Sequence, residues 1–299
     1  MAARIHLLFL GAVLLAASSP GPSAAGSPCA CKDAALCKPL VKPAGVREVL
    51  AFIDKNRTWP HLDYSTVTTV CAFERPVDLA LVCHAHSRGV RVVMSAPFNV
   101  SQIEDAAART AWVQAHLALV QNDGLGKYRN NPHRNSTEIY DASLLVLPDG
   151  LNLDIEGYKG KPEPLTALVA ELYHALKGWH AESQLSFDLS ILPAGQAAHY
   201  DHGKLSKVLD FIVPMAYDEP WNTKVAAPNS PMATIAKGIA QYLAVGVPAS
   251  KLVIGLPWCK KRHIVAVVSA NPVETAASSL ENSTKNNWLF QCTYQPASC

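Results

Sequence analysis

The stretch DGLNLDIE, residues 149–156, decides the fold. Successive side chains of a strand point to opposite faces, so Asn152, Asp154 and Glu156 share one face and the apolar residues between them share the other. A row of polar groups on a buried strand suits an α/β barrel, in which one face of each strand lines the lumen and the lumen opens at the carboxyl ends. The stretch therefore predicts a parallel barrel strand that ends in carboxylates.

Other segments on both sides of this stretch also read as strands. They are short apolar runs rich in β-branched residues, and Gly, Pro, Asn or Asp bounds each of them, which is typical of buried strands. With residues 150–156 included, the expected strands are residues 48–54, 67–73, 90–96, 150–156, 184–190, 211–217 and 251–257.

Helical patterns lie between several of these strands. The expected helices are residues 76–87, 102–120, 164–179 and 231–245, and the first begins with Pro and ends just before Gly89. Alternating strands and helices predict parallel strands joined by crossover helices. Seven such strands favour a (β/α)8 TIM barrel over an open doubly wound sheet, and no Gly-rich phosphate loop follows the first strand.

Composition excludes several classes of protein. Apolar residues make up 49% of the 299 residues and charged residues 17%, which excludes a disordered chain and a coiled coil. The net charge of +2, with no long basic run, excludes a nucleic-acid partner. We expect a monomer.

The first 25 residues resemble a secretory signal peptide. One Arg precedes a short apolar run, and small residues follow it. The apolar run is shorter than the roughly 20 residues that a membrane span needs, and no later stretch is long and apolar enough, so we expect no membrane partner.

Sequons and cysteines agree with secretion. Eight cysteines are present, and Cys29, Cys31 and Cys37 could form disulfides that staple the mature N-terminus; a zinc site is the rival reading, which the spacing disfavours. The pairing of the cysteines stays open. The Asn-x-Ser/Thr sequons predict glycosylation at Asn56, Asn99, Asn135 and Asn282.

Two strand ends carry the candidate chemistry. Asp154 and Glu156 are adjacent on one face, so their charges repel and one should hold a proton near neutral pH, which makes Glu156 a candidate general acid supported by Asp154. The alternative reading is a solvated strand end with capping acids. At the end of residues 211–217, Tyr217 and Asp218 suit a hydroxyl-rich ligand, and Trp258 could stack on a sugar.

These residues carry a family resemblance. Residues 149–156 resemble the DxxDxDxE signature of family 18 glycoside hydrolases, the chitinase family. Residues 215–218 (MAYD) resemble its Met-x-Tyr-Asp strand, and residues 255–258 (GLPW) resemble its Gly-x-Pro-Trp strand. Within the family, Asn152, the Cys-x-Cys-x5-Cys spacing and residues 83–93 (CHAHSRGVRVV) point to one branch, that of a lysosomal exoglycosidase.

The resemblance implies a retaining, substrate-assisted mechanism without metal or cofactor. Glu156 would protonate the glycosidic oxygen, Asp154 would orient the 2-acetamido group that attacks C1, and Tyr217 would hydrogen-bond that group. The implied partner is an N-acetylglucosamine-containing oligosaccharide, either the GlcNAcβ1-4GlcNAc core of Asn-linked glycans or a chitooligosaccharide. The lysosome is the implied location, with secretion as the alternative. The implied substrate-binding residues are Asp149, Asn152, Met215, Asp218 and Trp258.

The chain departs from the family pattern in two places. Residues 121–148 form a long insertion before the catalytic strand, and residues 259–299 have no counterpart of the eighth strand. We therefore expect a signal peptide at 1–25, a family 18 barrel at 26–258 that is incomplete at its C-terminal end, and an unmatched tail. A catalytically weak or inactive chitinase-like sugar-binding protein is the alternative function, and an unstable product is a third reading.

Overall fold

A parallel β-sheet is the centre of the computed structural model, which describes residues 29–43, 45–53, 58–73, 77–123, 146–218 and 228–257. The predicted signal peptide, most of the 121–148 tract and the 259–299 tail lie outside the described residues.

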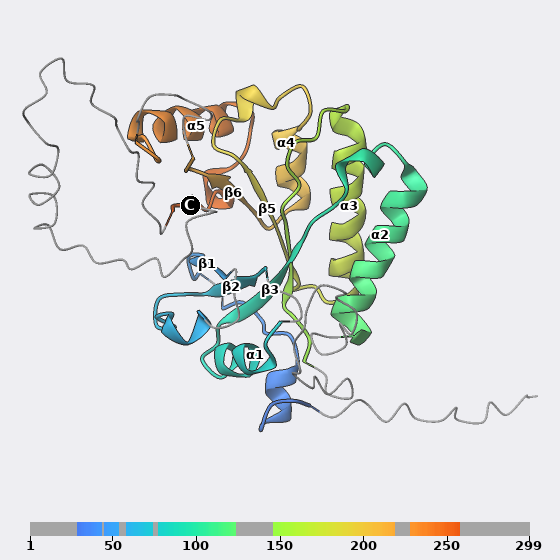
Figure 1. Ribbon diagram of the computed structural model, residues 1–299, viewed down its shortest axis with the longest axis vertical. Helices are drawn as coiled ribbons and strands as arrows, with labels where there is room; N and C mark the ends of the chain where they lie inside the picture. Colours follow the sequence, from blue (N-terminus) through green and yellow to red (C-terminus); the bar gives the residue numbers. More distant parts are fainter. Residues whose placement is uncertain are drawn as a thin grey trace, which may run out of the picture.

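The sheet has six strands in the order β1-β2-β3-β4-β5-β6, all neighbours being parallel (Figure 1). Each strand falls within a run that the sequence predicted, and β5 has the predicted bounds. The strands are β1 (Leu50–Ile53), β2 (Thr69–Ala72), β3 (Arg91–Ala96), β4 (Gly150–Leu153), β5 (Gln184–Ser190) and β6 (Phe211–Met215).

Strand β4 ends three residues earlier than the sequence predicted. Its last pairs are Ala96↔Leu153 on one side and Leu153↔Phe187 on the other. Because β3 itself ends at Ala96, no partner on that side continues the ladder. The chain from Asp154 to Glu156 therefore projects beyond the paired part of the sheet, at its carboxyl end.

The seventh predicted strand is shorter than expected. Lys251 belongs to the 3-10 turn Ala249–Lys251, and isolated parallel bridges join Leu252 to Ile212 and Gly255 to Met215. The Gly255 N–H donates to the Pro214 carbonyl at 2.9 Å, and the Gly255 carbonyl accepts from Ala216 N at 2.9 Å. This segment therefore follows the outer edge of β6, as the predicted strand order requires.

The helices also follow the predicted order, with different first residues. Asp105 caps α2 by accepting hydrogen bonds from Ala107 N at 2.9 Å and Ala108 N at 3.3 Å, so that helix begins later than predicted. The short α4 was not predicted. The helices are α1 (Leu79–His86), α2 (Ala106–Ala118), α3 (Pro162–Trp179), α4 (His202–Leu205) and α5 (Met232–Ala244).

The helices cover the apolar side of the sheet. Figure 1 shows α2 and α3 side by side along one flank of the sheet, with α1 beside β3 and α5 beyond β6. Leu165, Leu168, Leu172 and Leu176 recur at helical spacing on α3 and are fully buried. Burying each such side chain contributes about 1.5–3 kcal/mol. None of the helices in the described ranges is both long enough and apolar enough to cross a bilayer.

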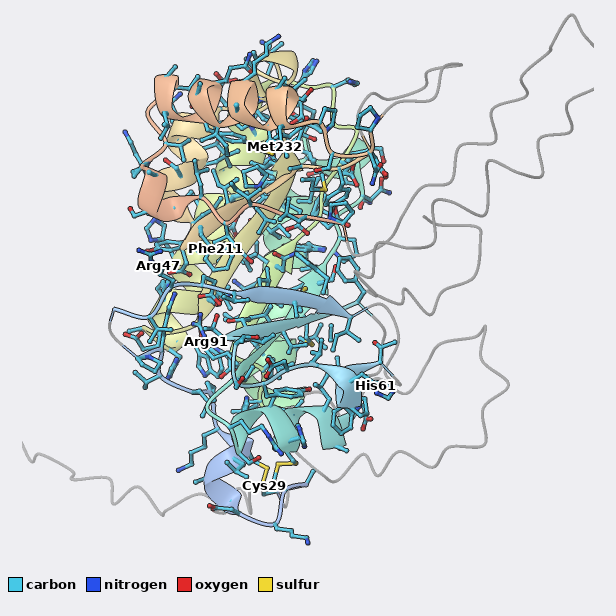
Figure 2. The ribbon with its side chains drawn as sticks, turned by 90° about the vertical axis from the view of Figure 1, so that its left-hand side faces the viewer. Cys29, Arg47, His61, Arg91, Phe211 and Met232 are labelled. Atoms are coloured by element: carbon cyan, nitrogen blue, oxygen red, sulfur yellow. A yellow bond between two sulfur atoms is a disulfide. The ribbon has the colours of Figure 1, made fainter. Side chains whose placement is uncertain are left out.

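Two disulfides fix the N-terminal segment, one within it and one to α1. Cys29 pairs with Cys37, and Cys31 pairs with Cys83 of α1. Figure 2 shows these sulfur–sulfur bonds beside Cys29, at the end of the molecule far from Met232. The disulfide interpretation of the cysteine cluster is confirmed, and the zinc interpretation is wrong because the sulfurs bond to one another.

Candidate active site

The carboxyl ends of β4, β5 and β6 bring one set of acidic and phenolic side chains together. Neighbouring strands of a sheet lie only about 4.8 Å apart, so groups that follow adjacent strands meet at one edge. Of these groups, β4 leads into Asp154 and Glu156, β5 carries Asp188, and β6 leads into Tyr217 and Asp218. Mutual effects on pKa, described below, tie these groups to one site.

Glu156 is exposed at the tip of this edge. Partial burial raises the pKa of its carboxyl, and the charges of Asp154 and Asp218 raise it further. These repulsive neighbours stabilise the protonated form, which is the form a general acid needs. The prediction that adjacent carboxylates keep a proton on Glu156 therefore agrees with the direction of its pKa shift.

Asp154 precedes Glu156 by two residues, next to the end of β4, and is half-buried. Burial raises the pKa of its carboxyl. Its Oδ1 atom is buried and has no hydrogen-bond partner among the described residues. A buried carboxylate oxygen without a partner is unfavourable in the absence of a ligand, so this oxygen is available to a donor group such as an amide N–H.

Asp188 is a member of this set that the sequence analysis missed. It is almost fully buried, and its Oδ2 accepts a 2.7 Å hydrogen bond from Asn152 Nδ2, while Ser186 Oγ donates to Asn152 Oδ1 at 2.6 Å. Burial places its pKa well above the usual range, against the opposing effect of the Asn152 hydrogen bond, and the charges of Asp154 and Glu156 add to the rise.

A signal for Asp188 was present in the sequence. In β5, polar residues at 184, 186, 188 and 190 alternate with apolar residues, which is the pattern that singled out β4. Asn152 is also better explained by this neighbour. An amide can donate to Asp188, whereas a carboxylate at position 152 would repel it.

Tyr217 and Asp218 come from the β6 side of the site, and Met215 precedes them as the last residue of β6. Burial raises the pKa of Tyr217, and the charges of Asp188, Asp154, Glu156 and Asp218 act in the same direction. Asp218 adopts the left-handed backbone conformation (φ 60°), which Asp tolerates better than most residues, and its N–H donates to Asn229 Oδ1 at 3.0 Å. Met215 is half-buried in the last position of β6.

Asp149 does not belong to the site, which corrects the expectation that it binds substrate. It precedes β4, at the opposite end of the strand from Glu156, and its side chain is fully buried. Its oxygens accept from Leu40 N at 2.5 Å and Val92 N at 2.5 Å, and they contact His86 Nε2 at 2.8 Å. With both oxygens occupied by the protein, Asp149 is a structural group.

Several predicted site residues lie outside the described residues. They are Trp258 and the sequon residues Asn56, Asn135 and Asn282. Asn99 is described: it is exposed, and its Oδ1 accepts from Ser101 N at 3.1 Å and Ser101 Oγ at 2.9 Å. In the part of the chain that the structure describes, the one His/Cys/Asp/Glu group close enough to hold a metal is Cys29, Cys31 and Cys37, whose sulfurs form disulfides.

Comparisons with known proteins agree with this arrangement. Residues 91–289 match the family "Glycosyl hydrolases family 18". This match extends beyond Trp258, where we predicted that the family-like region ends. The boundary at Trp258 stays a prediction.

Curated relatives show which members of the family this chain is similar to. Di-N-acetylchitobiase of Rattus norvegicus is 31% identical over 82% of this chain and 62% of its own length. Di-N-acetylchitobiase of Homo sapiens is 30% identical over 79% of this chain and 57% of its own length. The chain thus spans about three fifths of the relatives it matches. These relatives are the branch to which Asn152 and the cysteine spacing pointed.

A solved structure supports the fold. A mutant of the class V chitinase of Nicotiana tobaccum in complex with NAG4 superimposes with a TM-score of 0.55 at 17% identity, covering 71% of this chain and 67% of the chitinase chain.

Proposed function

Because the chain belongs to family 18 of the glycosyl hydrolases, we propose that it is an exoglycosidase that hydrolyses the GlcNAcβ1-4GlcNAc core of Asn-linked glycans and chitooligosaccharides. Two comparisons support the substrate class. Curated relatives carry the name di-N-acetylchitobiase, and a structural neighbour was solved with NAG4. The observation that carries the proposal is Glu156, an exposed carboxyl whose pKa is raised by burial and by two neighbouring acids.

Glu156 acts as the general acid. Its carboxyl proton goes to the glycosidic oxygen as the bond from that oxygen to C1 breaks. The acetamido oxygen of the same sugar attacks C1 and gives an oxazolinium ion. Water then adds to C1 and gives a proton to the Glu156 carboxylate, so the configuration at C1 is retained.

Asp154 and Tyr217 hold the acetamido group during this step. The unpartnered Oδ1 of Asp154 accepts the acetamido N–H, and its charge stabilises the cation that develops. The raised pKa keeps the Tyr217 hydroxyl protonated, so it can donate to the acetamido oxygen. Asp218 and Met215 line the sugar site from β6, and Asn152 supports the site through its hydrogen bond to Asp188. The sugar-stacking role of Trp258, which lies outside the described residues, stays a prediction.

We assign the chain to the (β/α)8 class. The six-stranded parallel sheet and the bridges from Leu252 and Gly255 to β6, which continue it toward a seventh strand, support this assignment. We propose the lysosome as its location, with secretion as the alternative. Exposed Asn99 is the described sequon that a glycan can reach.

Hydrolysis of a fluorogenic N-acetylchitobioside by the purified protein tests the proposal. We expect cleavage by the parent and a loss of about 10²–10⁴-fold in kcat for Glu156→Gln. Glu163→Gln is the matched control, because Glu163 is an exposed glutamate in the first turn of α3, and it should retain activity.

Two other results would have different meanings. A folded parent that binds chitooligosaccharide without cleaving it would replace the enzyme with the sugar-binding alternative. A parent without a cooperative melting transition would point to an unstable product.

A further inference from the structure

Tyr200 reaches from the segment between β5 and α4 to the turn that carries Glu156. It is 2% exposed, and its hydroxyl donates to the Ile155 carbonyl at 3.1 Å. The same hydroxyl accepts from Tyr158 N at 3.3 Å. One side chain thus bonds the backbone just before Glu156 and the backbone two residues after it.

These two hydrogen bonds span a turn that lies outside the paired part of the sheet. Glu156 lies beyond the last pair of β4, and Gly157 follows it in the left-handed conformation (φ 73°), so sheet hydrogen bonds do not fix this part of the chain. The rest of the loop is held from elsewhere: Tyr158 Oη donates to Glu104 Oε1 at 2.6 Å, and His199 Nδ1 contacts the Gly160 carbonyl at 2.8 Å. Tyr200 holds the part next to the acid.

Backbone position decides where a general acid points. A misplacement of about 1 Å can lower a rate roughly 10²-fold, because proton transfer needs the donor within hydrogen-bond reach of the leaving oxygen. Without the Tyr200 hydroxyl, a buried carbonyl and a buried N–H would lose their partners. Because buried polar groups without partners are unfavourable, we expect the turn to shift toward water and to displace Glu156.

We propose that Tyr200 is a positioning residue for Glu156, whose hydroxyl holds the Ile155 carbonyl and the Tyr158 N–H so that the acid faces the glycosidic oxygen. This inference rests on the proposed role of Glu156. Burial raises the pKa of the Tyr200 hydroxyl, and the charge of Glu156 acts in the same direction, as expected for two side chains that lie close together.

Tyr242 offers a matched control. It is fully buried, and its hydroxyl donates to the Ser190 carbonyl at the end of β5 at 2.6 Å. Tyr200→Phe and Tyr242→Phe each remove one hydroxyl from a buried tyrosine that bonds a main-chain carbonyl near a strand end. They differ in whether that carbonyl adjoins the acid.

We expect Tyr200→Phe to lower kcat by about tenfold or more while KM for the chitobioside stays within about twofold. The descending limb of its pH profile should move to lower pH, because a loosened turn removes the remaining partial burial of the Glu156 carboxyl, and this burial is the largest cause of its raised pKa. Tyr242→Phe should keep kcat within about twofold with a similar fall in melting temperature. Equal kcat in the two variants, or an unmoved pH profile in Tyr200→Phe, would overturn the proposal.

Hydrogen–deuterium exchange separates this proposal from the proposed function. Peptides covering residues 155–161 should take up deuterium faster in Tyr200→Phe than in Tyr242→Phe, whether or not the chain cleaves sugars. Equal uptake would overturn the role of Tyr200. A parent that exchanges as expected but cleaves no chitobioside would instead overturn the proposed function.

Discussion

The two ends of β4 carry aspartates in opposite situations. At the start of the strand, Asp149 is fully buried, and both of its oxygens have partners in the protein. Just past its end, Asp154 is half-buried, and its Oδ1 has no partner among the described residues. The same residue type, five positions apart, is satisfied by the fold at one end and left for a ligand at the other.

The start of β4 therefore stabilises the fold, whereas the chain just past its end carries the candidate site. Asp149 joins the N-terminal segment, α1 and β3 around the first residue of β4, next to the disulfide between Cys31 and Cys83. The close packing at this end also restricts position 150 to glycine, because a Cβ there would lie 2.0 Å from the Gln184 carbonyl oxygen. The opposite end keeps carboxyls close together with raised pKa values, an unfavourable arrangement that a catalytic site can use.

The largest expected effect is on stability, from Asp149→Asn. Both His86 ring nitrogens face acceptors, the Leu36 carbonyl at 2.7 Å and Asp149 at 2.8 Å, so the ring is an imidazolium paired with a buried carboxylate. Removing one partner of such a pair costs about 3–5 kcal/mol of unfolding free energy. Urea unfolding should show this loss, while kcat per folded molecule stays within about twofold.

The exposed Asp63 provides the control for that experiment. It accepts hydrogen bonds from Ser65 N at 3.0 Å and Ser65 Oγ at 2.6 Å at the surface, and Asp63→Asn should change the urea midpoint little. A large loss of kcat in folded Asp149→Asn would place Asp149 in the candidate site and contradict the comparison.

Asp154→Asn should give the reverse result. Loss of the charge that stabilises the developing cation should lower kcat about 10²–10³-fold. Because burial disfavours the charged form of Asp154, the neutral amide should leave the melting temperature unchanged or raise it. Steady-state kinetics and thermal melts of the same preparation measure both. A melting temperature that falls as far as in Asp149→Asn would mean that the two ends do not differ.

The sequence indicated the candidate site at the carboxyl end of β4, but it did not indicate the structural role of the residue that precedes the strand. Alternation within residues 149–156 is a local pattern, and it was enough to place Asp154 and Glu156 on one face at a strand end. The role of Asp149 depends on Leu40, His86 and Val92, which come from three separate segments. No local pattern contains such a set, so the family motif grouped Asp149 with the site.

One feature that the sequence left open and one that it missed have physical causes of the same kind. The pairing of Cys31 with Cys83 joins residues 52 apart, and spacing within the N-terminal cluster cannot reveal it. Asp188 was visible in the alternation of β5, but its importance comes from Asn152 on the neighbouring strand. The strands themselves were predictable because each is a short run rich in apolar residues, or alternates apolar with polar residues as β4 and β5 do.

The pH dependence of stability gives a smaller effect from the structural end. Burial alone lowers the pKa of His86, but its hydrogen bond to Asp149, the Asp149 charge and the Leu36 carbonyl together raise it above the usual 6.5. Folded protein therefore binds the His86 proton more tightly than unfolded protein does. The stabilisation is complete below about pH 6.5 and is lost as pH rises through the folded-state pKa.

Melting temperatures measured from about pH 5 to pH 9 check this sign. The parent should lose stability toward the alkaline side, and His86→Gln should be less stable at acid pH and lose less as pH rises. A parent whose stability increases over that interval would contradict the imidazolium assignment.

The smallest effect should come from Asp188→Asn, at the catalytic end. Burial, with the charges of Asp154 and Glu156, raises the pKa of Asp188 well above the usual range, which favours the neutral side chain in the folded protein. An amide has nearly the same shape, and its carbonyl can still accept from Asn152 Nδ2. The unfolding free energy at acid pH should therefore change by less than about 1 kcal/mol.

The pH dependence makes this small effect decisive. Folded parent binds the Asp188 proton more tightly than unfolded parent, so the parent loses stability as pH rises from about 4 through the raised pKa, and Asp188→Asn does not. The melting temperature of the variant should accordingly gain on the parent across that interval. A difference that is constant with pH would mean that Asp188 ionises alike in both states. Asp188 would then be a structural carboxyl group like Asp149 and not a member of the candidate site like Glu156.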